Sequence, residues 1–448
     1  MNLTDTFIDI LDSLRRATLS PTVSHQAKRC LLDYLGATLA GAEMLDARIR
    51  VLLEDVNESV GECAVIGVGR CSGSAMAAFA NGLSSHAAEL DDGVISGIVH
   101  PGAPLFSDFL QVAQQNDVGG RDLLRGIVTG YEAAVRLADA IQPSHKARGY
   151  HATSTCGAAA AAIGIAAMLA LPKARMKDAF SAAAVSAAGS LKVLEDDSEL
   201  KPFNVGRAAA VGLLSATMAR AGFIGPCDVL EGTGGFLTTL AADVHVEHLT
   251  KAAGAAFGVE RVYVKPYAAC RYCHGGIEAA LDIRRRSGLD PEQIASVDVS
   301  TYRWAVAKHD HTEISNASSA KMSIPYSVAV ALARGRAGIH EFSAEVIGDA
   351  LVTSLTRKVK VRSDEELTAL FPAKTVTVVD VVARDGGRYS KRIDAPKGEP
   401  ETPLSDAELE NKFAELASYA GQSRDAQRNI VNAVWNLEDD LPALFRLL

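Results

Sequence analysis

The sequence predicts a mainly α-helical protein, with a large all-helical domain and a smaller inserted α+β domain. Three observations support this prediction. Apolar residues recur at helical spacing over residues 1–261, β-branched residues alternate with polar ones over much of 262–394, and helical spacing returns after Pro396. We therefore expect residues 1–261 and 395–448 to form the helical domain and residues 262–394 to form the α+β domain.

The helical domain should be a tightly packed bundle, because alanine and glycine are frequent in it and small side chains let helices approach closely. An alanine-rich apolar run at 156–171 is shorter than the ~18 residues that a membrane span needs. We therefore expect a buried helix there. Helical spacing marks residues 6–16, 24–39, 73–90, 105–115, 121–141, 158–169 and 208–221.

Strand signals dominate the α+β domain. Residues 262–266, 296–303 and 357–363 are rich in β-branched residues. Two alternating runs within 373–394 flank Asp385-Gly386-Gly387, which predicts a β-hairpin. Helices are expected at 326–334 and 343–355. A further helix at 405–419 should begin with Ser405 as its N-cap.

Composition and charge limit the possible functions. The chain has 448 residues, which favours two domains, and a net charge of −9, which argues against nucleic-acid partners and acidic membrane surfaces. The N-terminal segment lacks the basic start and apolar core of a secretion signal. Seven scattered cysteines do not form a disulfide framework. We therefore expect a cytoplasmic protein that binds neither nucleic acid nor membrane.

Ionisable residues gather between His86 and Gly102, in the segment HAAELDDGVISGIVHPG. Acids and imidazoles in one place are what a proton-transfer site needs, and lysines or arginines in the same cleft would bind an anionic small molecule. We expect one metal-free pocket. The candidate residues are Glu89, Asp91, Asp92, His100, His151, Lys201, Lys265, Arg271 and His274.

The motif CRYCH at 270–274 has the CxxCH pattern of c-type haem attachment, and CxxC pairs also occur in zinc and redox sites. Haem attachment would require export, and a zinc site would need more ligands than His309 and His311 plausibly supply. We therefore expect no metal and no cofactor.

Seven motifs occur in order along the chain: HAAELDDG…HPG, GYHATSTCGAAAAA, LKPFNVGRAAAVG, LEGTGGF, KPYAACRYCHGGIEA, KMSIPYSVAVAL and GEPETPLSDAELENKF. Together they resemble the 2-methylcitrate dehydratase (MmgE/PrpD) family, whose members include cis-aconitate decarboxylase and iminodisuccinate epimerase. The resemblance spans most of the chain. It implies a large helical domain, a smaller α+β lid domain, an active site between them, a cofactor-free site for small di- or tricarboxylates, and a homodimer.

Carried over position by position, the resemblance implies which residues act. It places five residues in the chemistry: Glu89, His100, His151, Lys201 and Tyr326. It places Lys265 and His274 at the site as well, and we expect them to bind substrate. Apart from the resemblance, the acids, the tyrosine and the arginine beside these motifs are further candidates for substrate binding: Asp91, Asp92, Tyr150 and Arg271. Three positions depart from the family pattern: Glu89 stands for an Asp, Gly93 for a Thr that is frequent in the dehydratases and decarboxylases, and Asn204 for a histidine.

Loss of water, loss of CO2 and epimerisation beside a carboxylate all build negative charge on a carbon next to an ionised group, so preformed cationic donors must stabilise that charge. We rank a hydro-lyase of the 2-methylcitrate dehydratase type first. An iminodisuccinate-type epimerase and a cis-aconitate-type decarboxylase follow. The non-enzyme alternative is a catalytically silent carboxylate-binding protein, in which these residues are ordinary helix caps, ion pairs and core histidines.

Overall fold

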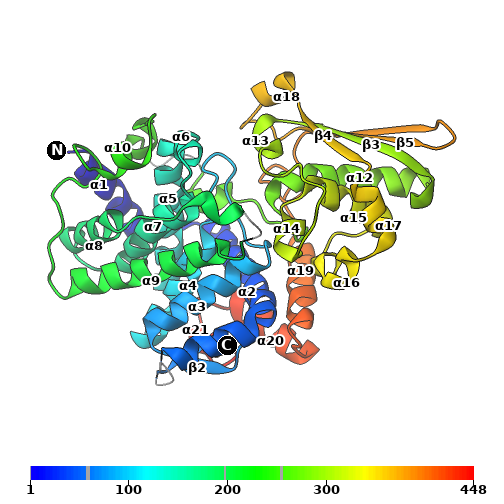
Figure 1. The fold of residues 1–448 in the computed structure, drawn as a ribbon. Coiled ribbons are helices and arrows are strands. Elements are labelled where there is room, and N and C mark those ends of the chain that lie inside the picture. Colours follow the sequence, from blue (N-terminus) through cyan, green and yellow to red (C-terminus); the bar gives the residue numbers. More distant parts are fainter. Residues whose placement is uncertain (1, 57–60, 196–197, 253–255) are drawn as a thin grey trace. The chain divides into compact units, whose positions relative to one another are not determined.

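The computed structural model describes residues 2–448 except 57–60, 196–197 and 253–255. Its contacts divide the chain into two compact units. Unit 1 comprises Met1–Val193, Leu200–Val264 and Ser405–Leu448, and unit 2 comprises Leu194–Glu199 and Lys265–Leu404. The described chain is mainly α-helical, as the sequence predicts, and its strands form one short hairpin and one four-stranded sheet (Figure 1).

Unit 1 packs around α7 (Ala152–Met168), whose residues are all buried. The buried helix expected at 156–171 is therefore confirmed. Alanine fills most of α7, so the neighbouring helices α4, α5, α8 and α9 can pack closely against it. The helices of unit 1 are α1 (Leu3–Arg16), α2 (Pro21–Asp55), α3 (Ser74–Ala87), α4 (Gly102–Gln115), α5 (Gly120–Ile141), α6 (Ser144–Ala147), α7, α8 (Lys173–Val185), α9 (Lys201–Arg220), α10 (Phe236–Leu240), α11 (Glu247–Thr250), α19 (Asp406–Tyr419), α20 (Arg424–Trp435) and α21 (Leu441–Phe445).

Two helix contacts of unit 1 are so close that only glycine fits. A Cβ on Gly82 of α3 would lie 2.7 Å from the Cα of Gly206 in α9, and a Cβ on Gly41 of α2 would lie 1.8 Å from the carbonyl oxygen of Ser84. Helix α3 is thereby fixed against both neighbours, which determines where its C-terminal end lies. That end carries the most acidic segment of the site described below.

Several predicted boundaries were wrong for local reasons. Helix α2 runs to Asp55 rather than residue 39, because Ile49 and Leu53 continue the buried face. Helix α3 ends at Ala87 rather than residue 90, because the backbone of Glu89 is left-handed and does not continue the helix. Residues 262–266 form no strand, and Tyr263 makes only an isolated bridge with Gly93.

A short hairpin of β1 (Cys63–Val65) and β2 (Arg70–Ser72) precedes α3 and was not predicted. At the other end of unit 1, α19 begins as expected. The Ser405 hydroxyl accepts the Glu408 amide proton at 3.2 Å, and the Glu408 carboxylate accepts the Ser405 amide proton at 2.7 Å. This reciprocal capping box satisfies two amides that would otherwise lack partners.

Unit 2 contains a sheet with strand order β4-β3-β5-β6, in which β4 is parallel to β3 and the other pairs are antiparallel. The hairpin predicted around Asp385 is confirmed as β5 and β6. Helices α12 and α15 pack on the sheet (Figure 1), over the buried valines at 297, 299, 379 and 381. The strands are β3 (Ile294–Thr301), β4 (Val359–Ser363), β5 (Thr377–Ala383) and β6 (Arg388–Ile393).

The helices of unit 2 are mostly short. The helix expected at 343–355 is interrupted at Gly348, after which Asp349 caps a new helix by accepting the amide proton of Val352 at 3.0 Å. The α-helices are α12 (His274–Ser287), α13 (Arg303–Val306), α14 (Ala317–Lys321), α15 (Ile324–Arg334), α16 (Ala344–Ile347), α17 (Ala350–Thr356) and α18 (Glu365–Ala369). No helix in the described part of either unit is long and apolar enough to cross a membrane.

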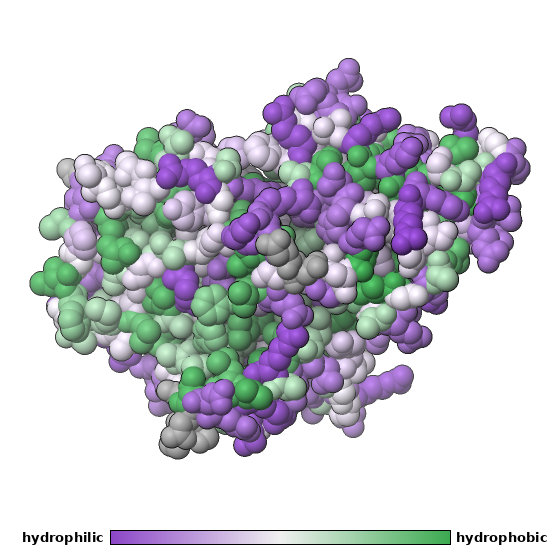
Figure 2. Space-filling view, in the orientation of Figure 1, coloured by the Kyte–Doolittle hydropathy of each residue, from purple (hydrophilic) through white to green (hydrophobic). Residues whose placement is uncertain are grey.

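Helix α9 leaves a row of apolar side chains exposed, and Figure 2 shows hydrophobic side chains gathered on this side of unit 1. Leu214 and Met218 are 51% and 43% exposed, and Phe223 and Ile224 just after the helix are exposed still further. Phe203 begins the row at the other end of the helix. Contiguous apolar patches of this kind on a protein surface commonly mark an interaction site.

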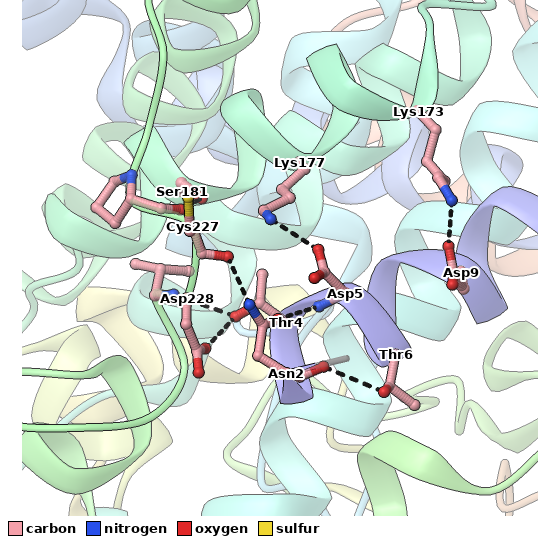
Figure 3. A network of polar contacts seen from close by, with 12 residues as sticks. Asn2, Thr4, Asp5, Thr6, Asp9, Lys173, Lys177, Ser181, Cys227 and Asp228 are labelled. Carbon is pink, nitrogen blue, oxygen red and sulfur yellow. Dashed lines mark hydrogen bonds and ion pairs between the residues drawn. The ribbon is translucent and has the colours of Figure 1, made fainter.

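The N-terminal helix α1 is fastened to a loop more than 220 residues away (Figure 3). The buried Thr4 hydroxyl donates to Asp228 at 2.6 Å and accepts the amide protons of Val229 and Leu230 at 3.1 and 3.2 Å. Ion pairs with α8 add to this attachment, namely Asp5–Lys177 and Asp9–Lys173. The start of the chain is therefore part of the packed structure of unit 1.

One carboxyl group inside unit 1 has no ion pair and no hydrogen bond of ordinary geometry among the described residues, although the backbone of Leu213 favours its ionised form. Asp108 of α4 is fully buried, and neither of its side-chain oxygens is hydrogen-bonded. Burial raises the pKa of Asp108 well above its ordinary value, because the charged form cannot be solvated. Burial therefore favours the protonated form of this group in the folded protein.

Asp108→Asn is expected to raise the free energy of unfolding by about 1–3 kcal/mol at pH 8 and not at pH 4. Because the pKa is raised in the folded state, the wild-type protein loses stability as the pH rises above the unfolded pKa of about 4. Asn does not ionise and removes that loss. Urea unfolding between pH 4 and 8 measures the effect, and Asp425→Asn on exposed α20 is the control. A gain that does not depend on pH would contradict the prediction.

Candidate active site

The segment between α3 and α4 brings three carboxylates into the interior of unit 1. Glu89, Asp91 and Asp92 are only 5%, 2% and 3% exposed. Both ends of the segment are held by packed helices, so its acidic residues are not free to turn toward water. Buried charges require partners, and each carboxylate contacts a different one.

Glu89 pairs with Lys201, the first residue of α9, across 112 positions of sequence. Both side chains are largely buried, so neither charge is well solvated and each depends on the other. The backbone of Glu89 has φ = 57°, a left-handed conformation that residues other than glycine rarely adopt. Such strain is concentrated at functional sites, and here it places the Glu89 carboxylate at the start of α9.

Asp92 holds the segment to the helices around it. Its Oδ2 accepts the Tyr131 hydroxyl proton at 2.5 Å, and its Oδ1 accepts the Gly102 amide proton at 3.0 Å. Burial is the main cause that raises the pKa of Asp92 to about 7. Two donors already occupy its oxygens, so this geometry favours a structural role rather than the substrate contact expected from the sequence.

His100 has a defined tautomer. Its Nδ1 lies 2.6 Å from the carbonyl oxygen of Asp92, which can only accept, so the proton of the neutral ring sits on Nδ1. The Nε2 atom therefore carries a lone pair. Asp91 Oδ2 lies 3.7 Å from Nδ1 and would stabilise a positive charge on the ring. The His100 amide donates to Thr153 at 3.1 Å, which ties it to α7.

His151 is the N-cap residue of α7 and is 6% exposed. Burial is the largest cause that holds the pKa of His151 well below its ordinary value, and the neighbouring groups His86, Lys201 and His100 lower it further. The Asn204 amide lies 3.5 Å from Nδ1, at the limit of a hydrogen bond, and would donate to that atom. The ring is thus neutral at pH 7, with its proton on Nε2. A neutral imidazole of this kind can act as a hydrogen-bond donor to an oxygen that gains charge.

Sequence reasoning did not single out His86, although it begins the acidic motif. Its ring is 1% exposed and lies 5.2 Å from the ring of His100 and 5.7 Å from that of His151. Its Nδ1 lies 2.7 Å from Asp91 Oδ2. The residue lies near the end of a helical segment, where a histidine is unremarkable, and the sequence offered no other signal than its place in the motif.

Gly93 is a glycine because Tyr263 occupies the space beside it. A Cβ on Gly93 would lie 2.3 Å from the phenol oxygen and 2.4 Å from its ring carbon Cζ. The two residues also form a β-bridge, with amide-to-carbonyl distances of 3.2 and 2.8 Å. The Tyr263 ring lies 6.3 Å from that of His100. The absence of the threonine that is frequent at this position of the family therefore has a steric reason.

The predicted site residues thus form two separate groups. Unit 1 brings together Glu89, Asp91, Asp92, His100, His151 and Lys201. Tyr150 also belongs to unit 1, but its ring packs on that of His145, at 5.4 Å.

Unit 2 contains the other four predicted residues, all buried: Lys265, Arg271, His274 and Tyr326. The Arg271 guanidinium donates to the Glu399 carboxylate at 2.6 Å and to the His274 Nδ1 at 3.0 Å. The Tyr326 hydroxyl donates to the Glu341 carbonyl at 2.7 Å. These contacts favour a structural role for the Tyr326 hydroxyl within unit 2.

The CxxCH motif also lies in unit 2. The sulfur of Cys270 lies 3.5 Å from His309 Nε2, and that of Cys273 lies 3.9 Å from the carbonyl oxygen of Lys321. Within the described ranges, no three His, Cys, Asp or Glu side chains are grouped so that they could hold a metal ion.

Two family models match this chain. The MmgE/PrpD N-terminal domain matches residues 5–248, and the MmgE/PrpD C-terminal domain matches residues 267–437. The chain belongs to the MmgE/PrpD family.

Curated relatives of this MmgE/PrpD protein are similar along nearly their whole length. The cis-aconitate decarboxylase-like protein oryM of Aspergillus oryzae is 27% identical, over 98% of this chain and 95% of the relative. Cis-aconitate decarboxylase of Aspergillus terreus is 26% identical, over 94% and 91%. The Homo sapiens cis-aconitate decarboxylase is 25% identical, over 98% and 92%. The named decarboxylases among these relatives are enzymes.

The geometry of unit 1 can perform proton transfer. It provides a lone pair on His100 Nε2, a neutral donor on His151 and a buried ammonium on Lys201. Positioned imidazoles transfer protons near neutral pH without large adjustment of their pKa. A buried cation and an N–H donor would stabilise negative charge that forms on an oxygen nearby.

Gly93→Thr is expected to lower the free energy of unfolding by about 1–3 kcal/mol, because Tyr263 must move to admit the new side chain. Tyr263→Ala should remove the clash, so the double variant should lose less than the sum of the two single losses. Urea unfolding measures all three. Gly119→Thr is the matched control, since nothing lies within 4 Å of a Cβ at that site. Additive losses would show that Tyr263 does not restrict Gly93.

Proposed function

We propose that this MmgE/PrpD protein is a lyase that moves a proton at a carbon beside a carboxylate of a small polycarboxylate. The observation that carries the proposal is the grouping of His100, His151 and the Glu89–Lys201 pair in one buried part of unit 1. The resemblance to the family implies that no metal takes part. This point is tested by assay after exhaustive chelation. Activity that survives supports it, and activity that is lost contradicts it.

In the proposed reaction, His100 Nε2 takes the proton from the carbon, and the electron pair left behind spreads onto the adjacent carboxylate. Lys201 and the neutral N–H of His151 would stabilise the charge on the carboxylate oxygens. For elimination of water, the electron pair then forms the double bond, the neighbouring C–O bond breaks, and the leaving hydroxide takes up the proton that His100 accepted. The products are one alkene and one water. Such a hydro-lyase is our first candidate, because the site offers both a base and a donor.

Decarboxylation is the second candidate, and the names of the relatives favour it. In that reaction the C–C bond to a carboxylate breaks, CO2 leaves, and the carbanion takes a proton from an imidazolium or ammonium. The same cationic groups would stabilise the charge. The steric exclusion of a threonine at Gly93 distinguishes this chain from the family pattern of dehydratases and decarboxylases, so the substrate remains to be identified by assay.

The reaction is tested by proton NMR of the chelator-treated protein in D2O with 2-methylcitrate, citrate, cis-aconitate and iminodisuccinate. An alkene formed with loss of water supports the hydro-lyase, and itaconate supports the decarboxylase. Deuterium at one carbon without loss of water or CO2 would replace both candidates with an epimerase. A panel without any turnover, combined with thermal stabilisation by the same carboxylates, would replace the lyase with a silent carboxylate-binding protein.

Two variants of His151 test its role as a neutral donor. His151→Gln keeps an N–H donor that does not titrate, whereas His151→Ala removes the donor. If His151 donates a hydrogen bond while neutral, both variants should lose activity, but kcat of the Gln variant should be at least about tenfold higher than kcat of the Ala variant. If His151 exchanges a proton with substrate, both variants should be equally inactive. Steady-state kcat from pH 6 to 8 separates the two roles.

We propose further that a second copy of the chain covers the apolar row on α9. This contact would form the homodimer that the family resemblance implies. Between Phe203 and Ile224 the only charged side chains are Arg207 and Arg220, and the Arg207 guanidinium is occupied by the carbonyl oxygens of Ser186 and Ala188. A long apolar face with so few charges favours a self-complementary contact, because a two-fold axis pairs the row with itself.

Leu214→Asp is expected to convert the dimer into a monomer, because it places a charge in the middle of the proposed contact. Light scattering after size-exclusion chromatography measures the mass. The control is Val51→Asp, which introduces the same charge at a side chain of α2 that is 56% exposed. A monomeric wild-type protein, or a Leu214→Asp protein that remains dimeric, would contradict the proposal.

A further inference from the structure

His86 is the most deeply buried imidazole of the site, and the proposed reaction does not use it. Its ring lies between the proposed base and the proposed donor, at 5.2 Å from His100 and 5.7 Å from His151. Its Nδ1 lies 2.7 Å from Asp91 Oδ2, and its buried Nε2 has no hydrogen-bond partner among the described residues. A buried nitrogen without a partner is costly, so the structure maintains this arrangement against a penalty.

The contact with Asp91 fixes the proton on His86. An ionised carboxylate only accepts, so Nδ1–H donates to Oδ2. His86 therefore donates to Asp91 and holds that carboxylate in position.

The same Asp91 oxygen lies 3.7 Å from His100 Nδ1. We propose that His86 is a positioning residue of this site, which holds the Asp91 carboxylate where it offsets the positive charge that forms on His100 when His100 takes a proton. The inference rests on the proposed function, because it assigns the base to His100. It adds a residue pair, Asp91 and His86, that acts through His100 and does not contact the substrate.

Ionisable groups from several elements surround His100 and affect the stability of its charged form. Asp91 belongs to the same segment, His86 to α3, His151 to the start of α7 and Lys201 to the start of α9. Glu89 pairs with Lys201 and reduces its effect, and the Tyr263 ring lies against His100 without a charge. Asp91 is the acid whose carboxylate contacts the His100 ring, with Oδ2 at 3.7 Å from Nδ1, and the same oxygen contacts His86.

Loss of His86 should act through Asp91. Without its donor, Asp91 protonates more readily or turns away, and the His100 imidazolium loses its counter-charge. His86→Phe and Asp91→Asn should therefore each shift the acid limb of kcat/KM to lower pH by about one unit and lower kcat at least about tenfold. KM should change by less than about threefold, since substrate binding is not involved. His86→Gln, whose amide can still donate to Asp91, should restore part of kcat.

The decisive experiment is a double-variant cycle on the full chain. If His86 acts through Asp91, the variant with both changes should be no slower than Asp91→Asn alone. His145→Phe is the matched control, because His145 is also fully buried and also has a ring nitrogen without a hydrogen bond among the described residues, while its ring contacts Thr155 and Tyr150. The acid limb of its kcat/KM profile should lie at the same pH as in the wild-type protein. Additive losses, or an unshifted acid limb in His86→Phe, would overturn the inference.

Nitrogen NMR of labelled histidines keeps the test independent of turnover. In the wild-type protein, His86 should carry its proton on Nδ1 from pH 6 to 8. In His86→Phe, or in Asp91→Asn if the former does not fold, the pKa of His100 should fall. If the wild-type protein turns over none of the four substrates, the proposed function fails, and the His100 titration alone decides the inference. If turnover is present and His100 titrates unchanged in the variants, only the inference fails.

Discussion

Burial of charge in the segment between α3 and α4 is the constraint on which the rest of the site depends. Three carboxylates enter the interior of a helical unit, and each finds a different partner: the Lys201 ammonium, the His86 imidazole, or the Tyr131 hydroxyl with a backbone amide. These partners come from α9, α3 and α5. The site is therefore assembled by the same contacts that allow the acids to be buried, and removal of one partner would leave a charge without compensation.

The three carboxylates have different roles because they contact different partners. Asp92 has both oxygens occupied and holds the segment to α4 and α5, whereas its backbone carbonyl fixes the tautomer of His100. Asp91 contacts two imidazoles instead. Residues adjacent in sequence thus take a structural and an electrostatic role, because their side chains contact different neighbours.

Much of this site could be predicted from the sequence, and the limits have physical causes. The acidic motif and the imidazoles were recognised because three acids and a histidine lie within a short stretch of sequence between two predicted helices. Lys201 was placed at the site only by resemblance to the family, since no spacing reveals a partner 112 residues away. His86 was missed because a histidine near the end of a helix carries no local signal. The strand expected at 262–266 was wrong because Tyr263 bridges Gly93 alone instead of joining a sheet.

The Gly93–Tyr263 contact gives a steric reason for one departure of this chain from the family pattern. A family comparison reads position 93 as a missing threonine, whereas the structure places a phenol oxygen 2.3 Å from where the first side-chain atom of any substitute would lie. The hydroxyl-bearing group at this place thus comes from a different part of the chain, 170 positions away, and its phenol is intrinsically more acidic than an aliphatic alcohol. The Tyr263 ring also lies beside that of His100, at 6.3 Å between the ring centroids, so this contact joins position 93 to the imidazoles of the site. A chain can therefore keep the family's fold and its cluster of imidazoles while differing from its relatives in the carbon at which it moves a proton.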